Sequence, residues 1–124
     1  MRQHNLKPAI IFALNAGSTG YEESLLNGLG IHCKVLIGSY KKVTEYSYIA
    51  DASDLDKLKS LLRETNQESV LYLDNQRNAY LLYALDNYTE QKYIGDWTEV
   101  SQQTALKEDA YTFDIETGKY YIVA

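Results

Sequence analysis

Apolar segments separated by polar, glycine-containing segments predict a chain of short strands and helices. Residues 9–14 are apolar without interruption, which predicts a central strand covered on both faces. Residues 15–20 are small and include glycines, so they predict a loop. Residues 21–29 predict a short helix that begins with acidic residues and ends at glycines.

The next segments predict an antiparallel pair of strands. Residues 31–37 alternate between apolar and polar side chains and end at Gly38, and residues 45–50 form the third strand. Residues 39–44 give only a short polar connection, which makes these two strands antiparallel.

An amphipathic helix begins at Ser53. Ser53 and Asp56 fit the serine-x-x-acid form of a capping box. The leucines that follow share one face of this helix, namely Leu55, Leu58, Leu61 and Leu62. Further strands are predicted over residues 69–73, 79–84, 88–94 and 119–123.

This order of elements predicts an α+β fold, a ferredoxin-like βαββαβ sandwich with a C-terminal β extension. The helices of such a sandwich cover one face of the sheet. The other face and the exposed edges then need cover from the extension or from another subunit. The sequence therefore predicts a single domain over residues 1–124 that assembles into an oligomer.

Composition narrows the class of protein. The 124 residues contain no apolar run near the roughly 20 residues of a membrane helix, so no membrane partner is expected. Cys33 is the only cysteine, which excludes an intrachain disulfide and a cysteine zinc cluster. These features favour a soluble protein of a reducing cytoplasm.

Charge and aromatic content indicate the kind of partner. The net charge is −5 and the cations are scattered, so nucleic acid is not expected as a partner and a cationic small molecule or a basic protein surface fits better. The chain has 12 tyrosines against 2 phenylalanines and 1 tryptophan. Tyrosine is typical of binding interfaces and also of half-buried strands, so this excess fits either role.

Several familiar sites are absent. The chain has neither the GxxxxGK[ST] phosphate loop nor the GxGxxG dinucleotide pattern. His4 and His32 are its only histidines, and neither has a carboxylate or cysteine at metal-ligand spacing. No metal site is therefore expected.

Three polar features remain as candidates. They are the loop over residues 15–20, the segment from Gly38 to Tyr40 together with Glu45, and residues 66–68 at a helix-to-strand junction. Each also has an ordinary structural interpretation, as a turn, a surface hairpin and a helix end.

Taken in order, the features along the chain form a longer pattern. An apolar strand precedes a small-residue loop, and a G-x-Y turn at Gly38 and Tyr40 precedes a strand opened by Glu45. An amphipathic helix leads to a Q-x-x-V-L strand start at Gln67, and an acidic turn ending at Gly118 leads to an aromatic-rich strand. This ordered set resembles the small phage-encoded S-adenosylmethionine (SAM) lyases, formerly called SAM hydrolases.

The resemblance implies an activity and an assembly. It implies a homotrimer of ferredoxin-like cores with the active site at the subunit interfaces. The implied reaction cleaves SAM to 5′-methylthioadenosine and L-homoserine lactone by attack of the substrate's own carboxylate, without a cofactor or metal. Acting in the host cell cytoplasm, such an enzyme would deplete host SAM and counter SAM-dependent restriction.

The resemblance also implies roles for particular residues. An anion beside the sulfonium would stabilise the ground state more than the transition state, so a catalytic carboxylate is better placed on the substrate ammonium. Glu45 is accordingly expected to bind the amino group, and Tyr40 to support the methionine end. The expected substrate-binding residues are Asn15, Ser18 and Gln67 for ribose and adenine, with Glu68 as the alternative acid.

Other functions remain open from the residues alone. A trimeric sensor or sponge for an adenine nucleotide would share the fold, the acidic charge and the tyrosine-rich surface. An acidic inhibitor of a host protein is a further alternative. A SAM methyltransferase is disfavoured, because the glycine-rich SAM loop of the common methyltransferase fold is absent.

Overall fold

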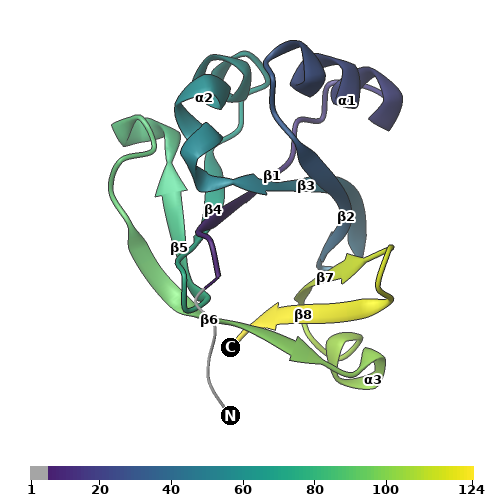
Figure 1. The fold of residues 1–124 in the computed structure, drawn as a ribbon. Helices are drawn as coiled ribbons and strands as arrows, with labels where there is room; N and C mark the ends of the chain where they lie inside the picture. Colours follow the sequence, from purple (N-terminus) through teal and green to yellow (C-terminus); the bar gives the residue numbers. More distant parts are fainter. Residues whose placement is uncertain (1–5) are drawn as a thin grey trace.

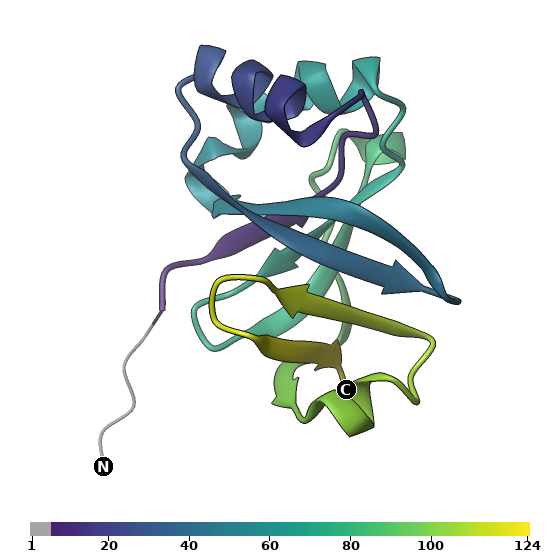
Figure 2. The ribbon, with the colours of Figure 1, turned by 90° about the vertical axis from the view of Figure 1, so that its right-hand side faces the viewer.

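Eight strands close into an antiparallel barrel in the computed structural model, which describes residues 6–124 (Figure 1). Around the barrel the strands follow the order β1-β3-β2-β7-β8-β6-β5-β4. Two helices, α1 and α2, lie together outside the barrel, at the top of Figures 1 and 2. Within the described residues, no helix has both the length and the apolar character needed to cross a membrane.

The strands and helices have the following bounds. The strands are β1 Ala9–Phe12, β2 Cys33–Tyr40, β3 Val43–Asp51, β4 Ser69–Leu73, β5 Asn78–Tyr83, β6 Lys92–Val100, β7 Ala110–Asp114 and β8 Lys119–Val123. The α-helices are α1 Thr19–Gly28, α2 Leu55–Glu64 and α3 Gln102–Ala105, and the 3₁₀ helices are η1 Ala52–Asp54 and η2 Ala84–Asp86.

The predicted ferredoxin-like sandwich is wrong. Strands β4, β1, β3 and β2 do lie side by side, with α1 and α2 over one face of them. The sheet, however, continues past β4 through β5 and β6, and past β2 through β7 and β8, until β6 pairs with β8. The chain thus covers its own sheet edges, which the sandwich left for a partner subunit to cover.

The barrel wall separates two apolar cores. The helix-side core packs α1 and α2 on the outer face of the barrel and includes Ile10, Phe12 and Leu58. The inner core lies inside the barrel and contains Ile11, Leu36, Leu73 and Ala79. Strand β1 is buried along its whole length because its side chains alternate between these cores, as the apolar run predicted.

The β2–β3 hairpin is tighter than the sequence predicts. The expected polar connection over residues 39–44 is wrong, because Ser39 and Tyr40 belong to β2 while Val43 and Thr44 belong to β3. Only Lys41 and Lys42 form the turn, and both have left-handed backbone angles, with φ of 50° and 68°. Two left-handed residues match the twist of the flanking strands, which closes the hairpin in the shortest way.

Two further predictions are corrected. The strand predicted over residues 88–94 begins instead at Lys92, and Tyr88 is buried in the helix-side core. The capping box at Ser53 does not form: Ser53 lies in η1, and its backbone N–H donates to the Asp51 carboxylate at 2.9 Å. The strands over residues 69–73 and 119–123 are confirmed.

A buried carboxylate ties α1 to the barrel. Glu22 is only 3% exposed and accepts hydrogen bonds from the Tyr48 hydroxyl at 2.6 Å and from the Ala16 N–H at 2.7 Å. Burial and the Glu22 carboxylate raise the pKa of Tyr48, so the hydroxyl stays protonated as a donor. This contact joins the loop after β1, the first turn of α1 and the middle of β3.

Removing this donor should destabilise the fold. Tyr48→Phe is expected to lower the free energy of unfolding by about 1–3 kcal/mol, because the buried Glu22 carboxylate loses a partner. Tyr46→Phe is the matched control on the same strand, where the side chain is 52% exposed, and should change stability by less than about 0.5 kcal/mol. Urea unfolding followed by circular dichroism measures both. Equal stability of the two variants would contradict a stabilising role for this hydrogen bond.

Candidate functional site

Two pockets meet at Glu45. The first, which we call the aromatic pocket, has a volume of about 560 Å³ and is lined by residues that include Tyr40, Glu45, Trp97 and Tyr121. The second, the polar pocket, has a volume of about 430 Å³. Its polar lining consists of Glu45, Ser47, Asn66, Gln67, Glu68 and Ser69. Both volumes lie in the range of small-molecule sites, about 300–1,000 Å³.

Strand register places Glu45 and Tyr40 on the inner face of the barrel wall. Glu45 pairs with Gly38, and Tyr40 lies two residues beyond Gly38 on β2. Side chains two residues apart share a face, and Leu36, two residues before Gly38, belongs to the inner core. The predicted catalytic pair therefore lies on the inner face, where the barrel opens near the hairpin turn.

The surroundings of Glu45 leave its carboxylate available to a ligand. The residue is exposed, and among the ion pairs of residues 6–124 none involves Glu45. Its cross-strand neighbour Gly38 has no side chain to cover it. A Cβ at Gly38 would meet the Ser47 hydroxyl at 3.1 Å, so even alanine would crowd this part of the wall.

Tyr40 contributes an exposed aromatic ring. The residue is 60% exposed, and the Lys41 ammonium lies 5.3 Å from the centre of its ring. This distance is within the range of a cation–π contact, so the ring face already holds a cation.

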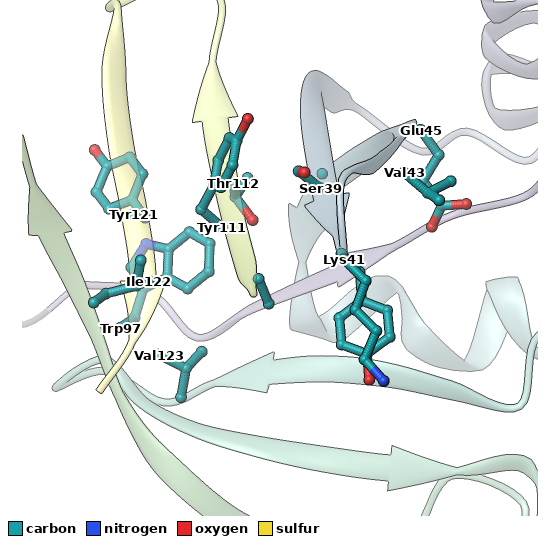
Figure 3. Close-up of a pocket in the computed structure, with 13 residues that line it drawn as sticks. Ser39, Lys41, Val43, Glu45, Trp97, Tyr111, Thr112, Tyr121, Ile122 and Val123 are labelled. Atoms are coloured by element: carbon teal, nitrogen blue, oxygen red, sulfur yellow. The ribbon is translucent and has the colours of Figure 1, made fainter. Parts of the chain in front are cut away.

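Trp97 and Tyr121 form the opposite wall of the aromatic pocket (Figure 3). Their rings are stacked, with centres 5.1 Å apart and planes 12° apart. Trp97 pairs with Val123 across β6 and β8, the strands that complete the barrel. The sequence prediction did not include these two residues, although the single tryptophan and the excess of tyrosine were a signal for an aromatic site.

The polar pocket contains the other predicted acid. Glu68 is exposed and lines this pocket with Glu45, so the pocket presents carboxylates and hydroxyls. Gln67 also lines it, but its side-chain amide donates to the carbonyls of Leu14 at 3.0 Å and Thr65 at 3.1 Å. The Gln67 amide nitrogen thus connects the end of α2 to the segment after β1.

Asn15 and Ser18 are not among the residues that line these two pockets. Ser18 caps α1, because its hydroxyl accepts from the Tyr21 N–H at 3.2 Å. Asn15 is exposed on the loop with a left-handed φ of 51°. The structure therefore brings Tyr40 and Glu45 together in one pocket, and Glu45, Gln67 and Glu68 in the other. The roles expected for Asn15 and Ser18 stay predictions.

The lining groups limit the chemistry that the site can perform. The two pockets offer carboxylates, hydroxyls, side-chain amides and aromatic faces, together with the ammonium of Lys41. In the described part of the chain, no group of three or more His, Cys, Asp and Glu side chains is placed to hold a metal ion. Carboxylates beside aromatic rings suit a ligand that carries positive charge and a flat aromatic group.

The fold and the site thus define a small β-barrel protein with an acidic, aromatic binding site. A sequence model of the S-Adenosylmethionine lyase family matches residues 15–124. The chain belongs to this family and is an enzyme of the S-adenosylmethionine lyase type, which confirms the family that the sequence resemblance predicted. A comparison with curated proteins gives no match.

Proposed function

We propose that the enzyme cleaves SAM to 5′-methylthioadenosine and L-homoserine lactone. The observation that carries this proposal is the position of Glu45, an exposed carboxylate without an ion-pair partner in residues 6–124, where the aromatic and polar pockets meet. SAM carries an ammonium, a sulfonium and an adenine ring. The carboxylate and the aromatic rings of the site match these groups.

The reaction balances without a cofactor or an external nucleophile. One oxygen of the substrate carboxylate forms a bond to the substrate γ carbon while the bond from this carbon to sulfur breaks. The bonding electrons go to sulfur, so the sulfonium becomes the neutral thioether of methylthioadenosine. No proton has to move, and holding the methionine part folded supplies the acceleration through proximity.

In this proposal each lining residue binds a different part of the substrate. Glu45 binds the α-ammonium and directs the carboxylate toward the γ carbon, and Tyr40 contacts the methionine end. Trp97 and Tyr121 supply the flat surface on which adenine stacks. Glu68 is the second acid, on the other side of Glu45, and Gln67 orders the edge of the polar pocket.

We further propose that a homotrimer forms and that a neighbouring subunit covers this site. The barrel leaves no open sheet edge for a partner, so the support comes from exposed side chains instead. Tyr40 and Val43 are 60% and 71% exposed and pair with one another at the end of the hairpin that carries Glu45, which projects from the barrel in Figure 2. Such a group of apolar residues beside a site is typical of a surface that another chain covers. In the host cytoplasm this enzyme would deplete SAM and limit SAM-dependent restriction.

Product analysis tests the reaction. Purified enzyme and SAM in ¹⁸O-labelled water should give methylthioadenosine and unlabelled homoserine lactone at early times, measured by mass spectrometry. Homoserine formed later by opening of the lactone should carry the label in its carboxyl group. Label in the homoserine hydroxyl would show direct hydrolysis instead. Intact SAM would favour a nucleotide sponge or an inhibitor of a host protein.

Glu45→Gln tests the proposed role of the carboxylate. We expect turnover to fall by at least about 100-fold, because the amide keeps the size of the side chain and loses the charge that binds the ammonium. The stability of the single chain should be unchanged, since Glu45 is exposed on it, and light scattering checks that the variant assembles like the wild type. Glu90→Gln is the control at an exposed position outside both pockets and should retain full turnover. Near-wild-type turnover of the Glu45 variant would remove this residue from the mechanism.

Light scattering tests the assembly. At micromolar concentration we expect a mass of three chains, each of 14.2 kDa. Dilution that dissociates the trimer should lower the specific activity in proportion to the fraction dissociated, because each site would lose the neighbouring subunit that covers it. A fully active species with the mass of one chain would contradict a site shared between subunits.

A further inference from the structure

We infer that Lys41 binds the α-carboxylate of the substrate and makes the enzyme selective for sulfonium compounds that carry this group. The inference rests on the proposed function. Within the described chain, Lys41 is the one cationic residue that lines either pocket. The aromatic pocket therefore presents one cation, Lys41, and one carboxylate, Glu45.

This pair of charges matches a zwitterionic amino acid. Both residues belong to the β2–β3 hairpin, and Figure 3 shows both side chains extending from it. They do not pair with one another, and among residues 6–124 neither has another ion-pair partner. Because both residues line the aromatic pocket, we place the ammonium of a bound amino acid at Glu45 and its carboxylate at Lys41, which offers three N–H donors. The polar pocket has no cation and does not offer this match.

The backbone holds Lys41 in place although its side chain is exposed. The residue has a left-handed φ of 50°, and its N–H donates to the Asp109 carbonyl at 2.6 Å, which ties the turn to the start of β7. The ammonium lies 5.3 Å from the centre of the Tyr40 ring, and both residues line the aromatic pocket. Lys41 thus stands next to the ring that is proposed to contact the methionine end.

The charge changes during the reaction determine whether Lys41 contributes to substrate binding or to the rate of the chemical step. The carboxylate loses its negative charge as it attacks the γ carbon, so a cation beside it binds the ground state at least as well as the transition state. Lys41 should therefore contribute to binding and selectivity and should not raise the rate of the chemical step. An exposed ion pair contributes about 1 kcal/mol or less, which limits the effect to about fivefold in affinity.

The test compares Lys41→Gln with Lys42→Gln. Lys42 is the matched control, because it is the other left-handed turn residue, is exposed and lines neither pocket. The ligands are S-adenosylhomocysteine and its decarboxylated analogue, which differ only in the carboxylate. Both are thioethers without a sulfonium group, so the enzyme cannot cleave them during the measurement. Titration calorimetry gives the affinities. The fluorescence of Trp97, the only tryptophan, reports occupancy of the aromatic pocket.

We expect Lys41→Gln to weaken the binding of S-adenosylhomocysteine by about three- to fivefold, and to change the affinity of the decarboxylated analogue by less than about twofold. In turnover of SAM, KM should rise by the same factor while kcat stays constant. Lys42→Gln should change none of these values. If the wild-type enzyme cleaves SAM and Lys41→Gln has the same affinity for each ligand as Lys42→Gln, Lys41 does not bind the substrate carboxylate. If the wild-type enzyme neither cleaves SAM nor binds S-adenosylhomocysteine, the proposed function fails and the inference fails with it.

Discussion

The register between β2 and β3 decides on which side of the barrel wall the candidate catalytic groups lie. Glu45 pairs with Gly38 and Val43 with Tyr40, and the left-handed turn at Lys41 and Lys42 fixes this pairing. A slip of one residue would turn every side chain of a strand to the other face. Glu45 would then point away from both pockets. The tight turn is therefore part of the site as well as part of the fold.

Closure of the barrel brings the aromatic wall of the site opposite the hairpin. The inner core fills the middle of the barrel, and the aromatic pocket opens beside it between the hairpin and strands β6 and β8. Trp97 comes from β6 and Tyr121 from β8, far along the chain from Glu45. On the outer face, the Glu22–Tyr48 hydrogen bond connects α1 to β3, the strand that carries Glu45. The site thus depends on contacts on both faces of one strand.

Local patterns in the sequence were sufficient to predict the first half of the fold. The apolar run at residues 9–14 and the leucines of α2 gave elements close to the observed ones. The family resemblance, and not their spacing alone, pointed to Tyr40 and Glu45, which the structure places in one pocket. Closure could not be predicted in this way. It depends on pairing of β2 with β7 and of β6 with β8, between segments distant in sequence, and the five residues of β7 carry no strict alternation. The turn at Lys41 was missed because lysine is not typical of left-handed positions.

In the proposed mechanism, the arrangement of charges also explains how a site with few catalytic groups can catalyse the reaction. In an intramolecular displacement the nucleophile, the electrophile and the leaving group belong to one molecule, so the protein only has to select one conformation of it. A carboxylate at the ammonium orients the substrate without stabilising the sulfonium that must disappear. Aromatic rings can hold adenine while leaving both reacting charges free to neutralise each other. In the proposed mechanism the hairpin and the aromatic wall that it faces provide these contacts, and the closed barrel carries both.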